Sequence, residues 1–437
     1  MAIADAPLLI ERCRACGSGE LRPVIDLGEQ VQQGFFPRPG QPLPVSAAVP
    51  LRLVRCAGEC GLLQLDRSLP ASMLYGRYWY RSGTNATMRD HLRGIVESAL
   101  ALTPRPVPTV LDIGCNDGTL LSCYPVASRR YGVDPSDIVT SAADIATIHG
   151  LFPDDPAVAA LPSGGFDVIT TIAMFYDLDD PVRAAREIAR LLAVDGIWIV
   201  ELSYLPLMLA RNGFDTICHE HLTYYSLAVI DHVARAAGLR VFRAELNDCN
   251  GGSIRCFVCP AANPDFGDTV DSAFLDRLRA GERALRLDED APYLDLQRRA
   301  ETLRGELRDF LTRARDAGER IHVYGASTKG NVLLQYCGIG PELIDCAADR
   351  NPHKHGTVTP GTGIPIVSEA QSRALAPDWY LVLPWHFRRE FLEREREMIL
   401  SGTRLLFPLP ALDVVDAGNY GDALAVSAAL TDWLPCR

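Results

Sequence analysis

The chain lacks the features that mark several classes of protein. Its formal net charge of −12 gives it no basic excess, whereas a nucleic-acid-binding protein needs a basic face. Its longest apolar runs fall short of the ~18–20 residues that cross a membrane. The first residues have neither the basic start nor the apolar core of a secretory leader. We therefore expect a cytoplasmic protein that binds neither nucleic acid nor membrane.

The 13 cysteines are an odd number scattered over 437 residues, which does not suit a disulfide framework. Cys13 and Cys16 form a CxxC pair, Cys56 and Cys60 form a CxxxC pair, and a glycine follows each pair. Two close pairs of thiolates are what tetrahedral Zn²⁺ requires. The alternative is four free buried thiols, but this segment has little else to form a core. We predict a structural zinc module over residues 1–70.

The rest of the chain alternates strand and helix patterns. This alternation predicts α/β domains with doubly wound sheets, whose ligands bind at the strand C-termini. We expect one such domain over residues 71–255 and a second over residues 256–412, followed by a tail over 413–437. The length of the chain agrees with two to four domains.

The stretch "LDIGCNDGTLL" reads as a strand, a glycine turn and a helix. Gly114 and Gly118 let the backbone approach a ligand, and Asp134 ends the next strand about 20 residues later, where a carboxylate can bind ribose hydroxyls. Asn116 and Asp117 narrow the turn and add negative charge, which is poor for a pyrophosphate and acceptable for a sulfonium with an amino-acid tail. The alternative is that the glycines only turn the chain.

We therefore predict an S-adenosylmethionine site in a central class I, Rossmann-like methyltransferase sheet. We expect Asp112, Gly114 and Asn116 to hold the amino-acid tail, Asp134 the ribose, and the loop over residues 150–154 the adenine. The full predicted set of cofactor contacts is Asp112, Gly114, Cys115, Asn116, Gly118, Asp134, Pro135, Leu151, Phe152, Ala173 and Met174.

The stretch "FDTICHEHLTYYSL" gathers three ionisable side chains, His219, Glu220 and His221. Methyl transfer to carbon needs an enolate, and hence a base near the α-proton and donors near the developing oxyanion. The ordinary pKa of histidine, about 6.5, suits His221 as that base. Glu220 could orient an imidazole or take the proton itself, and His219 could donate to the oxyanion. The alternative is a helix cap and a surface histidine.

The four-cysteine module, "LDIGCNDGTLL", "FDTICHEHLTYYS", "NGGSIR" and "YGASTKGN" follow one another over residues 10–412. In this order the chain resembles the nucleotide-sugar C-methyltransferases of deoxysugar biosynthesis, which serve antibiotic and other natural-product pathways. The resemblance implies that His221 is the base, with Glu220 beside it, and that the substrate is a TDP-linked 4-keto sugar.

The resemblance also implies that Tyr78 or Tyr80 faces the sugar, so the predicted catalytic set is His221, Glu220, His219, Tyr78, Tyr80 and Tyr224. The chain departs from the family at Cys218, where well-known members have a tyrosine. It departs again in the loop "AMFYDLDDP", where those members have a histidine. Tyr176, Tyr224 and Tyr225 are the candidates to compensate.

The stretch "VYGASTKGN" predicts a second Rossmann-like domain with a strand, a glycine turn and a helix whose N-terminus, with a lysine, forms an anion site. We favour the diphosphate of a sugar nucleotide as its ligand. Asp349 resembles a ribose-binding acid, so NAD stays an alternative. The predicted substrate contacts are Tyr176, Asn250, Ser253, Ser327, Lys329, Asn331, Asp349, His355, Trp385 and His386.

The function predicted from the sequence is S-adenosylmethionine-dependent C-methylation of a keto-deoxysugar, by histidine-assisted enolisation and SN2 methyl transfer. An O- or N-methyltransferase, a C-methyltransferase of another metabolite, an NAD-linked dehydrogenase and a zinc-bearing interaction protein stay as alternatives. We expect a monomer or a weak homodimer.

Overall fold

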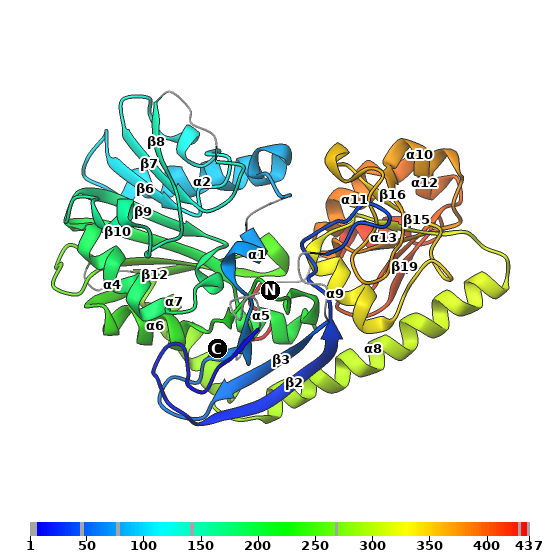
Figure 1. The fold of residues 1–437 in the computed structure, drawn as a ribbon, viewed down its shortest axis with the longest axis horizontal. Coiled ribbons are helices and arrows are strands. Elements are labelled where there is room, and N and C mark those ends of the chain that lie inside the picture. Colours follow the sequence, from blue (N-terminus) through cyan, green and yellow to red (C-terminus); the bar gives the residue numbers. More distant parts are fainter. Residues whose placement is uncertain are drawn as a thin grey trace.

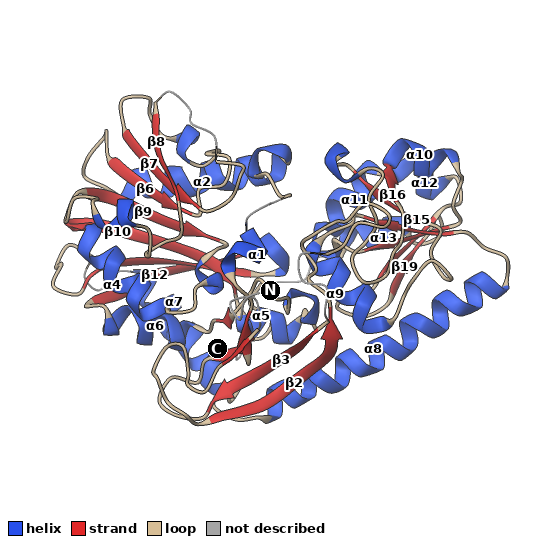
Figure 2. Cartoon of the chain, viewed as in Figure 1, coloured by secondary structure: helices blue, strands red, loops and turns tan. Residues whose placement is uncertain are grey.

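The computed structural model of the chain describes residues 7–43, 48–75, 79–139, 144–266, 270–426 and 430–434. Two lobes stand side by side, one coloured cyan and green and the other mainly orange (Figure 1). The long helix α8 (Ala291–Asp316) runs below them beside strands β2 (Leu21–Gln30) and β3 (Val49–Cys56). Strands form the interior of each lobe and helices lie outside them (Figure 2).

The N-terminal module contains a four-stranded antiparallel sheet in the order β11-β4-β3-β2. Strand β4 (Leu63–Leu65) follows β3, but β11 (Thr223–Tyr224) comes from much later in the chain and pairs Thr223 with Gln64. Two short strands, β1 (Leu8–Leu9) and β5 (Arg67–Ser68), pair beside this sheet. The residues that follow the H-E-H triplet are therefore part of the zinc module's sheet.

The first lobe is built on a seven-stranded sheet in the order β12-β13-β10-β9-β6-β7-β8, in which β13 runs antiparallel to both of its neighbours. The central strands are parallel, so the order reverses between β6 and β9, where a doubly wound sheet binds its ligand. The strands are β6 (Thr109–Ile113), β7 (Arg129–Asp134), β8 (Ile145–His149), β9 (Phe166–Ile172), β10 (Leu192–Ser203), β12 (Leu239–Asn247) and β13 (Ser253–Pro260).

Helices cover this sheet, and side-chain caps fix where some of them begin. Asp180 accepts the N–H of Arg183 at the start of α4, and Asn85 accepts that of Thr87 at the start of α2. The helices of the first lobe and its approach are α1 (Ala71–Tyr75), α2 (Ala86–Leu102), α3 (Pro156–Ala159), α4 (Pro181–Leu191), α5 (Leu205–Ala210), α6 (Leu227–Ala236) and α7 (Val270–Ala284). Single 3₁₀ turns are η2 (Ser82–Thr84), η3 (Leu121–Cys123), η4 (Phe175–Asp177), η5 (Phe214–Thr216) and η6 (Cys249–Gly251).

The helix predicted after the first glycine turn is wrong, because only the 3₁₀ turn η3 forms there. Tyr124 ends it in an extended conformation, with ψ of 155°. The next residue is Pro125, and a residue before proline is disfavoured in the helical region.

The second lobe has a six-stranded sheet in the order β16-β15-β14-β17-β18-β19, parallel except for β19. Numbered within the lobe this is 3-2-1-4-5-6, the Rossmann order, which confirms the second Rossmann-like domain. The strands are β14 (Ile321–Tyr324), β15 (Cys346–Asp349), β16 (Ile366–Ser368), β17 (Trp379–Val382), β18 (Arg404–Phe407) and β19 (Asp413–Val415). The helices are α9 (Thr328–Cys337), α10 (Glu369–Ala374), α11 (Arg388–Arg394), α12 (Arg396–Leu400) and α13 (Tyr420–Ala425), with 3₁₀ turns η7 (Pro352–Lys354) and η8 (Trp385–Phe387).

One predicted boundary falls inside a strand, and another falls directly before one. Residue 255 lies within β13, and α7 packs against β12 and α6, so the first lobe extends past it. The segment from residue 413 starts with β19, which pairs with β18, so it continues the second sheet.

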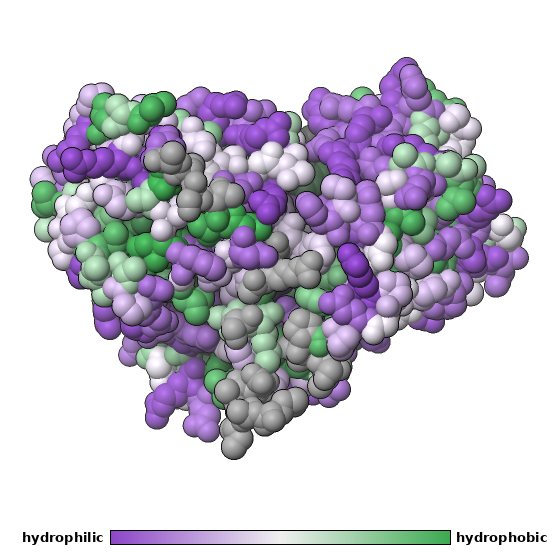
Figure 3. All heavy atoms as spheres, turned by 45° about the horizontal axis from the view of Figure 1, so that its top comes forward, coloured by the Kyte–Doolittle hydropathy of each residue, from purple (hydrophilic) through white to green (hydrophobic). Residues whose placement is uncertain are grey.

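Over the described ranges, no helix has both the length and the apolar character required to traverse a bilayer. On the face drawn in Figure 3, hydrophilic residues are spread over both lobes, and a recess separates the lobes.

Candidate active site

The four cysteines of the N-terminal module form one cluster. The Sγ atoms of Cys13 and Cys60 lie 3.5 Å apart, and those of Cys16 and Cys56 also lie 3.5 Å apart. All four sulfurs lie within 4.8 Å of one another. Thiolates about 2.3 Å from a shared zinc ion would be about 3.8 Å from each other, so the cluster fits tetrahedral zinc with no open position.

The glycine turn after β6 needs glycine for two reasons. Gly114 has a φ of +77°, and a Cβ there would lie 2.7 Å from Cγ of Met174. Its N–H donates to the carbonyl of Val133 at 2.7 Å, which ties the turn to the end of β7. The turn therefore has a left-handed conformation that favours glycine and no room for a side chain between Gly114 and Met174.

Two carboxylates stand at this edge of the sheet. Asp112 is buried and accepts a hydrogen bond from Oγ1 of Thr170 at 2.6 Å. Burial raises the pKa of Asp112 to about 7, with Thr170 opposing the rise and Asp134 adding to it. Asp134 accepts the N–H groups of Asn116 at 2.8 Å and Ser136 at 2.9 Å. Negative charge beside an open glycine turn fits a cationic sulfonium ligand.

The other predicted cofactor residues lie at the same edge. Pro135 follows β7, Leu151 and Phe152 follow β8, and Ala173 and Met174 follow β9. Gly118 has a φ of +75°. The side chain of Cys115 is buried towards Gly132, so only its main chain borders the turn.

A segment from the zinc module's side crosses the glycine turn. The amide of Asn116 accepts the N–H of Ser82 at 3.0 Å and donates to the carbonyl of Tyr80 at 3.1 Å. Asp117 accepts the N–H of Gly83 at 3.0 Å. The Asn116 side chain therefore anchors this segment, whereas we expected it to hold the amino-acid tail. The Tyr80 side chain is 48% exposed, and Tyr78 lies outside the described residues.

His221 has the geometry of a base. Its Nδ1 lies 2.8 Å from the carbonyl oxygen of Thr216, which can only accept, so Nδ1 carries the proton and Nε2 a lone pair. Its ring lies against Tyr176, with centroids 4.3 Å apart. Burial and then the charge of Lys329 lower the pKa of His221 to about 3, although Thr216 opposes the shift. The imidazole is neutral at physiological pH.

Glu220 faces the zinc module rather than His221. Its carboxylate lies against the main chain of Gly34, where any Cβ would overlap with it. Burial raises the pKa of Glu220 to about 7. Burial and the neighbouring Glu220 also raise the pKa of Asp177. The Thr216 carbonyl orients the ring of His221, whereas the sequence had suggested Glu220 for this role.

His219 joins the triplet to the module. Its Nδ1 lies 3.0 Å from Oε1 of Gln33, and its Nε2 lies 3.2 Å from the carbonyl of Val49. Burial lowers the pKa of His219 to about 4. Both ring nitrogens are used within the scaffold, so the structure gives His219 no donor for an oxyanion.

Cys218 and the tyrosines around the triplet are buried. Tyr224 lies in β11, and the described residues offer its hydroxyl no partner. The carbonyl of Tyr176 accepts the N–H of Leu222 at 2.9 Å, which fixes the chain just after the triplet. This leaves Tyr176 as the aromatic ring packed on His221.

In the second lobe, the residues of "VYGASTKGN" divide between scaffold and site. Ser327 caps α9 by accepting the N–H of Gly330 at 3.0 Å. Asn331 is buried and donates to the carbonyl of Gln33 at 2.8 Å, so it joins α9 to the zinc module. Lys329 crosses to the first lobe, where Nζ donates to the carbonyl of Asn250 at 2.8 Å.

The strand order of the second sheet reverses between β14 and β17. The turn between β12 and β13 contacts the segments that follow these two strands. The Trp385 ring would contact a Cβ on Gly251 at 3.3 Å, and its Nε1 donates to Asp215 at 2.9 Å. Burial and the charge of Lys329 lower the pKa of the adjacent His386 to about 3. Ser253 is buried and donates to the carbonyl of Cys249 at 2.9 Å, so it shapes this turn from within.

Asp349 ends the second strand of its sheet, as a ribose-binding acid would, but its charge already has a partner. It accepts the N–H of Ala326 at 2.9 Å and pairs with Nζ of Lys354 at 3.4 Å. The Nε2 of His355 lies 2.8 Å from the carbonyl of Asp349, which ties that histidine to the strand end. The Asp349 charge is thus matched by a protein cation.

Three residues near the site gave no signal in the sequence, because they come from separate elements. The ligand atoms of His91 on α2, Glu201 on β10 and Cys249 on η6 lie within 4.8 Å of one another. His91 lies 2.5 Å from Glu201, and Arg255 donates to the same carboxylate at 2.8 Å. Although burial opposes it, these two partners lower the pKa of Glu201. With Arg255 as counter-charge, the cluster is best described as an ion network.

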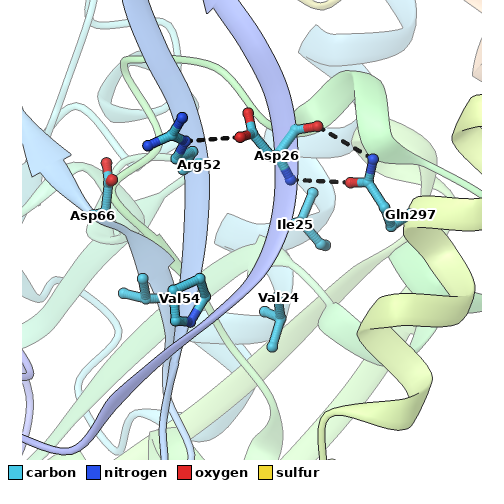
Figure 4. Close-up of a pocket in the computed structure, with 8 residues that line it drawn as sticks. Val24, Ile25, Asp26, Arg52, Val54, Asp66 and Gln297 are labelled. Carbon is cyan, nitrogen blue, oxygen red and sulfur yellow. Dashed lines mark hydrogen bonds and ion pairs between the residues drawn. The ribbon is translucent and has the colours of Figure 1, made fainter.

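A pocket on the zinc module lies apart from these residues (Figure 4). Asp26 pairs with Arg52 at 2.8 Å, and Gln297 of α8 bonds to the main chain of Asp26 at 3.0 Å. None of the predicted site residues lines this pocket.

Comparison with known proteins agrees with this architecture. Three family profiles match the chain in order: a zinc binding domain over residues 13–75, a methyltransferase domain over 85–244 and a C-methyltransferase C-terminal domain over 248–410. The chain is 30% identical over 426 residues to the C-methyltransferase NovU of Streptomyces niveus, which covers 93% of this chain and 97% of NovU. The chain belongs to this C-methyltransferase family.

Two more distant similarities cover smaller parts of the chain. The nocamycin O-methyltransferase of Saccharothrix syringae is 37% identical over 128 residues, which are 26% of this chain and 44% of that protein. A solved magnesium protoporphyrin IX methyltransferase from Synechocystis is 14% identical with a TM-score of 0.31, over 40% of this chain and 87% of its own.

The family and the fold together establish an S-adenosylmethionine-dependent C-methyltransferase with a structural zinc site. The comparisons give no support to an NAD-linked dehydrogenase.

Proposed function

We propose that the enzyme methylates a carbon next to the ketone of a TDP-linked 4-keto-deoxysugar, and that His221 is the base that forms the enolate. The observation that supports this most is the arrangement of His221. Its Nδ1–H is held by the Thr216 carbonyl, its half-buried ring packs against Tyr176, and no described residue occupies Nε2. A neutral imidazole with one orientation and one open lone pair suits removal of an α-proton.

In this reaction Nε2 of His221 takes the proton, and the electrons of the broken C–H bond form the carbon–carbon double bond of the enolate. The carbonyl oxygen of the substrate takes the negative charge. S-adenosylmethionine, held at the glycine turn after β6, would supply an electrophilic methyl group to the enolate carbon and leave as a neutral thioether. While the enolate exists, its charge offsets the cost of burying the imidazolium of His221, and after methyl transfer that imidazolium would release its proton to solvent.

The nucleotide part of the substrate would lie at the reversal point of the second sheet, between β14 and β17, where a Rossmann sheet binds its ligand. The Trp385 ring is buried there against the turn at Gly251, and Lys329 bonds to Asn250 of the same turn, so the first lobe meets the second at this place. A substrate held at this place would extend its sugar towards His221 across the junction of the lobes.

The test is exchange of the substrate α-proton with solvent. The wild-type enzyme should incorporate deuterium from D₂O into a TDP-4-keto-deoxysugar without S-adenosylmethionine. His221→Asn should slow both exchange and turnover at least ~100-fold, as loss of a general base does, and should still bind the cofactor. Methylated product without any exchange, or near-normal rates in His221→Asn, would count against enolisation and favour an O- or N-methyltransferase.

A further inference from the structure

Lys329 is unusual in this chain by its residue type. The sequence holds 43 lysines and arginines, of which only Lys329 and Lys354 are lysines. Lys354 has a protein anion, Asp349, at 3.4 Å. Lys329 has none: in the described residues no carboxylate lies within ion-pairing distance of its Nζ. One of the two lysines is therefore held without a direct counter-ion.

The surroundings of Lys329 leave part of its ammonium available. Nζ has three N–H donors, and the only acceptor that the described residues provide is the carbonyl of Asn250, at 2.8 Å. Burial lowers the pKa of Lys329, and Asp215, Cys218 and Cys249 oppose that shift. Of these Asp215 is buried and already accepts from Trp385, so it supports the charge from a distance.

The charge of Lys329 acts on the base. Lys329 lies in the first turn of α9, which packs against η5, and the Thr216 carbonyl of η5 holds His221. In agreement with this placement, Lys329 disfavours the charged form of His221 and of His386, and Asp215, Cys218 and Cys249 favour the charged form of Lys329. A cation near the base, with unused donors, is what an oxyanion formed next to that base requires.

We propose that the ammonium of Lys329 binds the substrate ketone oxygen and stabilises the enolate formed when His221 removes the α-proton. This rests on the proposed function and deepens it. The C–H electrons move into the new carbon–carbon double bond, the carbonyl π electrons move onto oxygen, and that oxygen accepts an N–H of Lys329. When the carbon takes the methyl group, the ketone re-forms and Lys329 keeps its protons.

The sequence suggested the diphosphate as the partner of Lys329, and two observations favour the enolate instead. The negative carboxylate of Asp215 is close enough to affect Lys329, and it would repel a diphosphate more than a single transient charge. The planar fork of arginine binds two phosphate oxygens at once, whereas an ammonium is a point charge that can bind a single oxygen as well as a phosphate. The chain uses arginine for nearly all its cations but lysine here.

The first experiment compares exchange with nucleotide binding. We expect Lys329→Met to slow deuterium exchange into the bound TDP-4-keto-deoxysugar at least ~100-fold, as loss of an oxyanion donor does, with TDP affinity within about threefold of wild type. Arg389→Met removes an exposed cation of the same lobe and should change neither quantity. Circular dichroism and zinc content show whether each variant is folded, and Lys329→Arg should keep the fold if Lys329→Met does not.

The possible outcomes lead to different conclusions about Lys329. Loss of TDP binding with normal exchange per bound substrate would make Lys329 a diphosphate ligand. Exchange that depends on His221 but not on Lys329 would overturn this inference and leave the proposed function intact. No exchange in the wild-type enzyme would overturn both.

A second measurement does not depend on turnover. Enzyme labelled with ¹⁵N-lysine should show only two lysine side-chain signals, one of which Lys329→Arg removes. We expect the TDP-4-keto-deoxysugar to move the Lys329 signal and TDP alone to leave it in place. A shift of equal size with TDP alone would place the diphosphate, and not the ketone oxygen, on Lys329.

Discussion

The two Rossmann-like sheets use the same device at the carboxyl edge of their strands, but the charges around it differ. In each sheet the aspartate that ends the second strand reaches back to the turn after the first strand. Asp134 accepts the N–H of Asn116 at 2.8 Å, and Asp349 accepts that of Ala326 at 2.9 Å. In each sheet a glycine with positive φ begins the turn, Gly114 in the first and Gly325 in the second.

The difference lies in what stands beside each aspartate. Asp134 has only hydroxyl and N–H partners, and Asp112 adds a second acid beside it. Asp349 is paired with Lys354, and Lys329, in the first turn of α9, directs its ammonium to Asn250 of the first lobe. The side chains around the shared turn therefore set the local charge, which is negative at Asp112 and Asp134 and balanced at Asp349. This difference fits the cationic cofactor in the first lobe and the anionic nucleotide that we propose for the second.

The largest effect should come from the two glycines. A Cβ on Gly114 would lie 2.7 Å from Cγ of Met174, and a Cβ on Gly325 would lie 2.5 Å from Cγ of Pro384. Strain of about 1–2 kcal/mol from positive φ adds to each overlap. We expect Gly114→Ala to weaken S-adenosylmethionine binding at least ~100-fold and spare TDP, and Gly325→Ala to do the reverse. Calorimetric titration of each variant with both ligands measures this.

Gly94 provides the matched control for the glycine pair. It lies inside α2, and a Cβ there would meet nothing within 4 Å. Gly94→Ala should leave both affinities unchanged and raise stability by about 0.5–1 kcal/mol. If Gly114→Ala weakened both ligands equally, the lobes would not bind them separately.

The sequence predicted what is local and failed where distant segments meet. The glycine turns, the strand-end aspartates and the cysteine pairs were predictable, because each depends on a few adjacent residues. The contacts of the H-E-H triplet were not predictable, because they involve distant segments. His219 bonds to Gln33, 186 positions away, and β11 pairs with β4 in the zinc module. Glu220 was assigned to His221 because the two are adjacent, yet it packs against Gly34.

The His91–Glu201–Cys249 cluster was missed for a similar reason. It joins a helix, a strand and a turn that no motif connects. A buried glutamate at the end of a central strand was the only hint, and a sequence does not show whether such a residue is buried.

A pH dependence should distinguish the two binding edges by a smaller amount. Burial raises the pKa of Asp112 to about 7, and its carboxylate is the form that attracts a cationic cofactor. Affinity for S-adenosylmethionine should therefore rise between about pH 6 and 8 and then level off. Because one proton is lost, the rise is at most about tenfold for each pH unit. Asp112→Asn should remove the rise. Affinity for the TDP-4-keto-deoxysugar, whose esterified diphosphate has no proton that titrates in this range, should lack the rise when measured in parallel by calorimetry, and a parallel rise would point to a global change.

The smallest effect should come from exchanging the two matched aspartates for asparagine. An amide has only one accepting oxygen, so Asp134→Asn loses one of the two hydrogen bonds that Asn116 and Ser136 donate. It also loses the negative charge. We expect S-adenosylmethionine affinity to fall about fivefold. Asp349→Asn leaves Lys354 without its counter-ion, so we expect unchanged cofactor affinity and a loss of about 1 kcal/mol in unfolding free energy. Cofactor titration and chemical denaturation separate the two effects. Weaker cofactor binding in Asp349→Asn would contradict the division of charge between the sheets, because Asp349 would then influence the cofactor from the other lobe.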